Sequence, residues 1–144
     1  MELNCSNMQM FGIKTSIIKP GDDLLKVLGT GFENTGIVPK DGDILILAES
    51  AVATAEHRIV NLKDVKPSET AKEFAQNYKL DPSEMELILQ ECDEIIGGVP
   101  GAALTITKGN LSPNAGIDSS NAPDGYVILL PEGAQKSAES IRKG

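Results

Sequence analysis

Two consecutive amphipathic helices in the middle of the sequence constrain the fold more than any other feature. The first spans 68–78, with Ser68 as its N-cap, and the second spans 81–96, with Pro82 at its first helical position. Gly97-Gly98 is predicted to end the second helix. The two apolar stripes consist of Ala71, Phe74, Ala75 and Tyr78, and of Met85, Ile88, Leu89, Cys92 and Ile96. Cys92 is therefore expected in the core and not as a nucleophile.

Short runs with strand character surround these helices. The continuous apolar run 44–47 follows the turn Asp41-Gly42-Asp43, which predicts a strand buried on both faces. Further strands are predicted within 8–18, 104–107, 111–115 and 126–130, with Pro113 indicating an edge or a bulge. This mixture predicts an α+β fold with a mixed, largely antiparallel sheet and flanking helices.

Two shorter helices and one loop complete the expected elements. A helix capped by Asp22 or Asp23 is predicted to end at Gly29-Thr30-Gly31, and another begins at 135 and runs to 143 with little apolar face. The small residues of 48–55 suggest a tight packing loop or a place where a ligand approaches the backbone closely.

Length and charge bound the possible functions. The 144 residues predict a single domain, 1–144, and the net charge of −8 with 3% aromatic residues argues against nucleic acid as a partner. No 18-residue apolar run and no signal peptide are present in the sequence, so no membrane span is expected. Cys5 and Cys92 match neither a disulfide framework nor a zinc site, which favours a reducing, cytoplasmic location.

Polar chemistry is concentrated in the segment 114–121. Asp118 stands there among hydroxyl and amide side chains, an oxygen-rich set of the kind that Mg²⁺ or Mn²⁺ prefers. The same residues also suit an Asx-turn in which Asp118 caps Ser120 or Asn121, and composition alone favours this structural role. The single histidine, His57, shows no spacing typical of a nucleophilic triad.

At this segment the sequence resembles the coenzyme F(420) gamma-glutamyl ligase family. Asn114-Ala115-Gly116-Ile117-Asp118-Ser119-Ser120-Asn121 is similar to the family's NAG-[IV]-D-x-SN motif. Further similar stretches follow the family's order: 17–24 (IIKPGDDL), 41–45 (DGDIL), 55–58 (AEHR), 67–71 (PSETA) and 137–142 (SAESIR). The resemblance extends from about Ile13 to the end of the sequence and corresponds to the N-terminal part of the family.

The resemblance implies a ligase that joins L-glutamate to a carboxylate of a deazaflavin cofactor precursor, with GTP as co-substrate and Mg²⁺ or Mn²⁺ as cofactor. It implies that Asp118 binds the metal and that the nucleotide contacts come from the following positions: Thr15, Ser16, Ile17, Ile18, Glu49, Ser50, Thr54 and Asn121. No catalytic residue is assigned. Family members form homodimers, so an oligomer is expected.

Two departures from the family pattern keep several interpretations open. Thr54 stands where the family has a nucleotide-contacting lysine, and His57 replaces a family glycine. Family members also continue for roughly another hundred residues, which carry a second metal-binding aspartate. The chain is therefore expected to be incomplete relative to the family fold: a fragment, a short relative, or one subunit of a split ligase completed by a C-terminal chain. The alternative is a non-catalytic nucleotide-binding or scaffolding paralogue.

Overall fold

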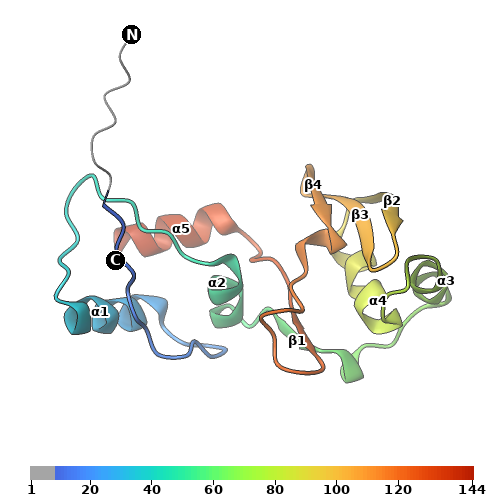
Figure 1. Ribbon diagram of the computed structural model, residues 1–144, viewed down its shortest axis with the longest axis horizontal. Coiled ribbons are helices and arrows are strands. Elements are labelled where there is room, and N and C mark those ends of the chain that lie inside the picture. The colour runs from blue at the N-terminus through green and yellow to red at the C-terminus, as the bar shows by residue number, and fades with distance from the viewer. Residues whose placement is uncertain (1–8) are drawn as a thin grey trace, which may run out of the picture.

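Helices and short antiparallel strands alternate along residues 9–144, which the computed structural model describes (Figure 1). The helices are α1 (Leu24–Thr35), α2 (Glu49–Ala55), α3 (Glu69–Tyr78), α4 (Pro82–Glu91) and α5 (Ala134–Lys143). The strands are β1 (Ile59–Asn61), β2 (Glu94–Val99), β3 (Ala102–Thr107), β4 (Asn110–Pro113) and β5 (Tyr126–Ile128). The predicted α+β class is confirmed. Cys5 and the first residue of the strand predicted at 8–18 lie outside the described residues.

The strands form two small antiparallel sheets. One sheet has the order β2-β3-β4, and the other pairs β1 with β5, strands that are distant in sequence. In Figure 1 the β1–β5 ladder lies between α1, α2 and α5 on one side and the three-stranded sheet with α3 and α4 on the other. Pro113 lies in the edge strand β4, as predicted, because an edge position does not require its missing N–H.

Side-chain caps start the two central helices as the sequence predicted. The Ser68 hydroxyl accepts from the Ala71 N–H at 3.2 Å, and Asp81 Oδ1 accepts from the N–H groups of Ser83 and Glu84 at 2.8 and 3.1 Å. The predicted end of the second helix is wrong, because α4 stops at Glu91.

The residues after α4 join the sheet instead. The Asp93 N–H donates to Ile106 O at 2.8 Å, so the chain has already entered the β2–β3 pairing. Gly97 and Gly98 lie inside β2 and do not end a helix. A Cβ atom on Gly98 would lie 2.6 Å from the Tyr78 ring, so the glycine permits this aromatic side chain to pack against the strand.

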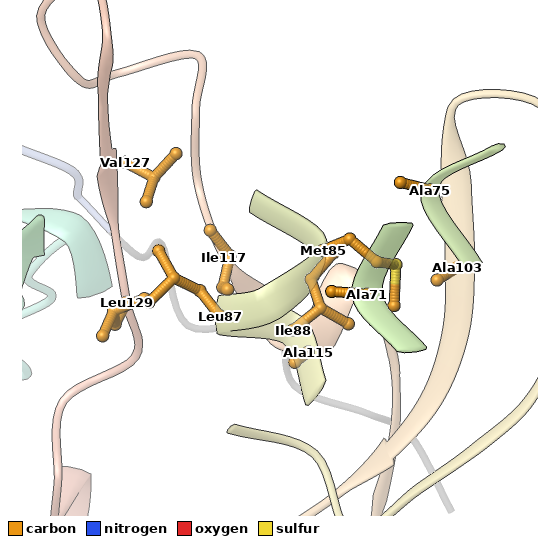
Figure 2. Packing of buried hydrophobic residues seen from close by; sticks show 10 residues of the cluster. All are labelled: Ala71, Ala75, Met85, Leu87, Ile88, Ala103, Ala115, Ile117, Val127 and Leu129. Atoms are coloured by element: carbon orange, nitrogen blue, oxygen red, sulfur yellow. The ribbon is translucent and has the colours of Figure 1, made fainter. Parts of the chain in front are cut away.

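The hydrophobic core lies between α3, α4, β3 and the chain around β5 (Figure 2). Its central side chains come from α4, where Met85 and Ile88 are fully buried, and from Val127 of β5. The other members are Ala71, Ala75, Leu87, Ala103, Ala115, Ile117 and Leu129. Cys92 packs against this cluster, and burial raises the pKa of its thiol, which agrees with the predicted structural role.

The N-terminal third of the chain differs most from the sequence-based expectation. Helix α1 passes through Gly29 and Gly31 and ends at the left-handed Gly36. A Cβ on Gly31 would lie 2.8 Å from the Ile13 side chain, so this glycine marks a close approach within the helix and not its end. The segment 48–55, predicted as a loop, is largely the helix α2. Alanine has the highest helix propensity of the amino acids, and the prediction of a loop gave the alanines of this segment too little weight.

Two predicted strands are absent from the described residues. Residues 9–18 are irregular, and the run 44–47 has no regular secondary structure and joins neither sheet. Ile44 and Ile46 are 80% and 81% exposed, so the prediction of a strand buried on both faces is wrong for this structure. The strand prediction assumed neighbours on both sides of the run, and residues 9–144 supply none.

Helix α5 is attached weakly, as its sparse apolar face predicted. It has no buried residue, and the Ser137 hydroxyl donates to the Glu56 carboxylate next to α2. Within residues 9–144, the helices are all too short or too polar to cross a membrane.

Candidate functional site

The segment 114–121 is a loop that hydrogen bonds anchor to the three-stranded sheet. Asn114, Ala115 and Gly116 adopt positive φ angles of 48°, 55° and 76° in succession, a conformation that costs energy for the two non-glycine residues. Hydrogen bonds to β3 hold it: Asn114 Oδ1 accepts from the Ala103 N–H at 2.8 Å, and the Ala115 N–H donates to Thr105 Oγ1 at 3.2 Å. The surrounding structure therefore imposes this backbone shape.

Gly116 is required at its position for a second reason. A Cβ atom on it would lie 2.7 Å from the Leu130 side chain, so any larger residue would force Leu130 to move away from the loop. Two residues later, Asp118 and Ile128 exchange both backbone hydrogen bonds at 2.8 Å. These contacts fix Asp118 beside β5.

The Asp118 carboxylate is the centre of an Asx-turn. Oδ1 accepts from the Ser120 N–H, the Ser120 hydroxyl and the Asn121 N–H at 2.9, 2.8 and 3.1 Å, and Oδ2 accepts from Asn121 Nδ2 at 2.6 Å. These bonds, led by the one from Asn121, lower the pKa of Asp118, so the side chain is ionised at neutral pH. The structural alternative predicted for this loop is thus present in the structure.

Asp118 also lines a cavity of about 120 Å³ together with two other residues that the family resemblance singled out. Glu49 and Ser50, the first two residues of α2, also line it, and the remaining lining residues are Gly116, Ile128, Leu129 and Leu130. Segments 66 residues and more apart in the sequence (Ser50 to Gly116) therefore contribute to one cavity. Sequence reasoning did not identify Leu129 and Leu130 as lining residues, because a strand end gives no such indication.

The first predicted nucleotide segment lies elsewhere. Ser16 lines a separate cavity of about 430 Å³ beside α1, with Gly21, Asp22, Asp23, Lys26, Val27, Thr30 and Gly31. Ile17 is 85% exposed, and Thr15 and Ile18 are half-buried. The structure thus brings Glu49, Ser50 and Asp118 together and places Ser16 in a different cavity.

Thr54 and His57 lie on and just beyond α2. Thr54 is half-buried on the helix and lines neither of the two cavities. His57 has a left-handed φ of 60°, which explains why glycine suits this position. Its imidazole lies over Gly21, where an added Cβ would be 3.0 Å from His57 Nε2.

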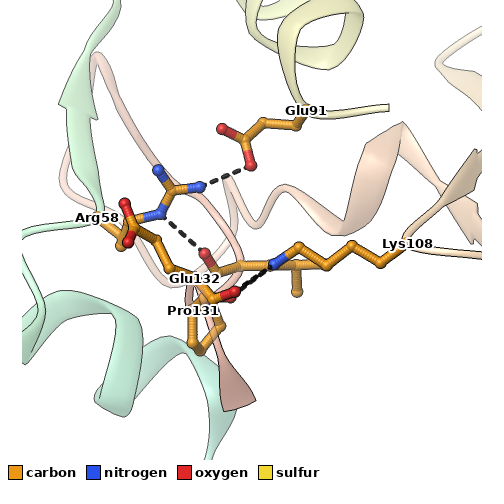
Figure 3. A network of polar contacts seen from close by, with 6 residues as sticks. Arg58, Glu91, Lys108, Pro131 and Glu132 are labelled. Atoms are coloured by element: carbon orange, nitrogen blue, oxygen red, sulfur yellow. Dashed lines mark hydrogen bonds and ion pairs between the residues drawn. The ribbon is translucent and has the colours of Figure 1, made fainter. Parts of the chain in front are cut away.

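Two cations hold the segment that carries the cavity wall (Figure 3). Arg58 donates from Nε to Leu130 O at 2.9 Å and pairs with Glu91 of α4 at 2.6 Å. Lys108, from the turn between β3 and β4, donates to the carbonyl oxygens of Pro131 and Glu132 at 2.9 and 3.0 Å. Sequence reasoning did not predict this network, since its acceptors are backbone carbonyls.

The donor set around Asp118 suits a hard cation only in part. Within residues 9–144, no group of three or more His, Cys, Asp and Glu side chains is arranged to hold a metal ion. The acidic residues Glu49 and Asp118 both line the cavity, and Asp118 Oδ2 accepts one hydrogen bond where a carboxylate oxygen can accept two. These oxygens fit Mg²⁺ or Mn²⁺ if phosphates or further residues supply the remaining ligands.

Comparison with known proteins identifies the family. The family model described as F420-0:Gamma-glutamyl ligase matches residues 12–144. Proteins named "Coenzyme F420:L-glutamate ligase" are similar to this chain. The one from Methanopyrus kandleri is 37% identical over 88% of this chain and 48% of its own length. The one from Methanothermobacter thermautotrophicus is 37% identical over 87% and 50%, and the one from Haloarcula marismortui is 33% identical over 95% and 54%.

The chain spans about half the length of these curated relatives. The match nevertheless includes both walls of the cavity, from α2 to the loop that carries Asp118. Because the family model matches residues 12–144 and several ligases of this family are similar to the chain, the chain belongs to the F420-0:gamma-glutamyl ligase family.

Proposed function

We propose that this chain carries the nucleotide- and metal-binding part of a ligase that adds L-glutamate to a deazaflavin cofactor precursor. The observation that carries the proposal is the cavity that Asp118 shares with Glu49 and Ser50. These positions come from separate family motifs, and their meeting at one cavity supports a common role in holding a metal and a nucleotide.

The reaction requires activation of a carboxylate. The γ-phosphoryl group of GTP passes to a carboxylate oxygen of the acceptor and GDP leaves. The amine of glutamate then attacks the acyl carbon, and phosphate leaves as the amide bond forms. A bound Mg²⁺ or Mn²⁺ supplies positive charge that offsets the charge of the phosphates.

The chain's own residues have defined tasks in this proposal. Asp118, kept ionised by its Asx-turn, would bind the metal through Oδ2, the oxygen with the free acceptor capacity. Glu49 and Ser50 would contact the metal or its phosphate ligands from their place in the cavity lining, and Asn121 would then orient the carboxylate. Ser16, with Thr15, Ile17 and Ile18, would contact the nucleotide from its own cavity once further chain encloses the site.

The binding part of the proposal is tested by calorimetry of Mn²⁺ with GTP. The unsubstituted chain should bind Mn²⁺–GTP, Asp118→Asn should weaken the binding by about tenfold or more, and Asp124→Asn, which changes an exposed acid in the turn before β5, should not change it. Equal Mn²⁺ binding by the unsubstituted chain and Asp118→Asn would refute the assignment.

A non-catalytic nucleotide-binding or scaffolding role is the second candidate, and two observations favour it. Thr54 replaces the family lysine, and two donors of Arg58, the nearest cation in sequence, are engaged with Glu91 and Leu130 O. A single metal-binding aspartate also supplies few protein ligands for a metal ion that must bind a triphosphate.

An activity assay separates the two candidates. The chain is incubated with GTP, Mn²⁺, L-glutamate and the deazaflavin acceptor, and phosphate release and glutamylated product are measured. We expect no product from the chain alone and turnover when the remaining part of a family ligase is added as a separate chain. Binding of nucleotide without turnover in either mixture would favour the non-catalytic role. Association into an oligomer and a cytoplasmic location, where GTP is available, belong to the same proposal.

A further inference from the structure

We propose that the run Ile44–Leu47, here called the open strand, is a docking strand for the part of the family sequence that this chain does not match. The proposal rests on family membership and on the exposed strand, and it requires no assumption about the reaction.

The open strand is held at both ends but paired along neither edge. At its start, the Lys40 N–H donates to Asp43 Oδ2 at 2.9 Å and the Asp43 N–H donates to Lys40 O at 3.1 Å, which fixes the turn. At its end, Ala48 is the N-cap residue of α2. Among the residues that the structure describes, no backbone hydrogen bond reaches 44–47. Its N–H and C=O groups are therefore available to a neighbouring strand.

Both faces of the open strand are apolar. Ile44 and Ile46, on one face, are 80% and 81% exposed, and Leu45, on the other, is 45% exposed. An exposed run of this kind is characteristic of a central strand that lacks its neighbours. The N-terminal third of the chain has other exposed apolar side chains as well, among them Ile17, which is 85% exposed, and Val38, which is 74% exposed.

Both free edges of the three-stranded sheet carry features that discourage pairing, and the open strand carries none. Pro113 removes a donor from β4, and a bulge between Ile95 and Gly97 interrupts β2. The open strand contains neither a proline nor a charge, so it favours the addition of a strand more than either edge of the three-stranded sheet does.

The exposed faces also indicate what kind of partner is required. A short peptide, or the same strand of a second copy, could supply one ladder but would leave both apolar faces in water. Covering both faces takes strands and a further layer, which means a folded unit. The relatives contain such a unit, because about half of their length lies outside the match to this chain. We therefore commit to that half as the occupant, in the same polypeptide or as a separate one.

Hydrogen exchange with a co-expressed partner tests the proposal. The probe is the half of the Methanopyrus kandleri relative that this chain does not match, expressed beside a tagged 1–144. We expect a one-to-one complex in which residues 43–47 become protected from exchange. Leu45→Lys and Ile46→Pro should weaken the complex by about tenfold or more. Leu111→Lys, a matched change of a 63% exposed residue on the edge strand β4, should leave it intact.

Several results would overturn the inference. These are a complex in which 43–47 still exchanges freely, a complex that only Leu111→Lys disrupts, or self-association of 1–144 that protects 43–47 without the probe. If the two halves do not combine across species, the same exchange measurement on the intact Methanopyrus kandleri protein decides, because rapid exchange of its aligned segment would contradict the proposal. Failure here would leave the metal-binding test unaffected, since that test uses the chain alone.

Discussion

Asn121 Nδ2 lies 2.6 Å from Asp118 Oδ2 and donates a hydrogen bond to it across the loop. This bond is the largest cause of the lowered pKa of Asp118. It also occupies the less engaged of the two carboxylate oxygens, so a cation that binds Asp118 must share that oxygen with the Asn121 amide. The ionisation and cation binding of Asp118 therefore depend on the side chain of Asn121.

Removal of the Asn121 side chain should raise the pKa of Asp118 toward its ordinary value of 3.8. A lowered folded pKa contributes stability above the unfolded pKa, and this contribution disappears as the pH falls through the folded pKa. The stability difference between the unsubstituted chain and Asn121→Ala should therefore be largest near neutral pH and vanish in acid. Carboxyl-detected NMR measures the titration. Ser119→Ala, which removes no donor to Asp118, is the control, and an equal shift in both variants would contradict the prediction.

His57→Gly should stabilise the fold. The left-handed φ of 60° costs a residue with a Cβ about 1 kcal/mol or more, and glycine relieves this strain. We expect the free energy of unfolding in urea to rise by about 1 kcal/mol. Gly36→Ala, at the left-handed end of α1, is the converse control and should lower it. A loss of stability in His57→Gly would show that the packing of the imidazole over Gly21 outweighs the strain.

The sequence predicted elements whose signals are local. The caps at Ser68 and Asp81 and the Pro82 start lie within a few residues of the helices they define, and the structure confirms them. The sequence misplaced elements that depend on distant partners. Strand β2 exists because the chain after α4 pairs with β3, and the apolar residues Cys92 and Ile96 continue the helical spacing of α4 and so gave no sign of that partner.

The candidate site shows the same division. The oxygen-rich loop around Asp118 and its Asx-turn follow from adjacent residue types, and both were anticipated. The cavity itself depends on contacts between α2, the loop and β5, and on Gly116, which admits Leu130 at close range. Periodicity and composition carry no information about such contacts between segments distant in sequence.

A substitution in the core should lower the free energy of unfolding far more than the same substitution in the open strand. Ile88 is fully buried, and Ile88→Ala should lower the free energy of unfolding by about 2–5 kcal/mol. Ile46 is 81% exposed, so the same change there should stay within about 0.5 kcal/mol. Urea denaturation of both variants provides the measurement. A large loss in Ile46→Ala would mean that the open strand is already covered in solution, for example by a second copy.

Thr54→Lys should strengthen GTP binding, because the family lysine is restored. A charge-assisted contact to phosphate contributes about 1.5–3 kcal/mol, which corresponds to roughly tenfold or more in affinity. Calorimetry with Mn²⁺–GTP measures the change, and Thr70→Lys, on the exposed start of α3, controls for added charge alone. Equal effects of the two lysines would exclude a specific phosphate contact at position 54.

Removal of the Arg58 side chain should destabilise the fold more than removal of an exposed lysine. Its guanidinium bonds to Glu91 and to Leu130 O, and its side chain is only 19% exposed, so Arg58→Ala leaves two shielded acceptors without their partner. We expect a loss of about 2 kcal/mol in the free energy of unfolding, since each lost hydrogen bond involves a charged group. Lys72→Ala is a matched control, because the Lys72–Glu69 pair has the same 2.6 Å separation but side chains 49% and 86% exposed. That pair should contribute less than about 0.5 kcal/mol. Similar losses in the two variants would show that the attachment of the cavity wall through Leu130 O contributes nothing beyond a surface ion pair.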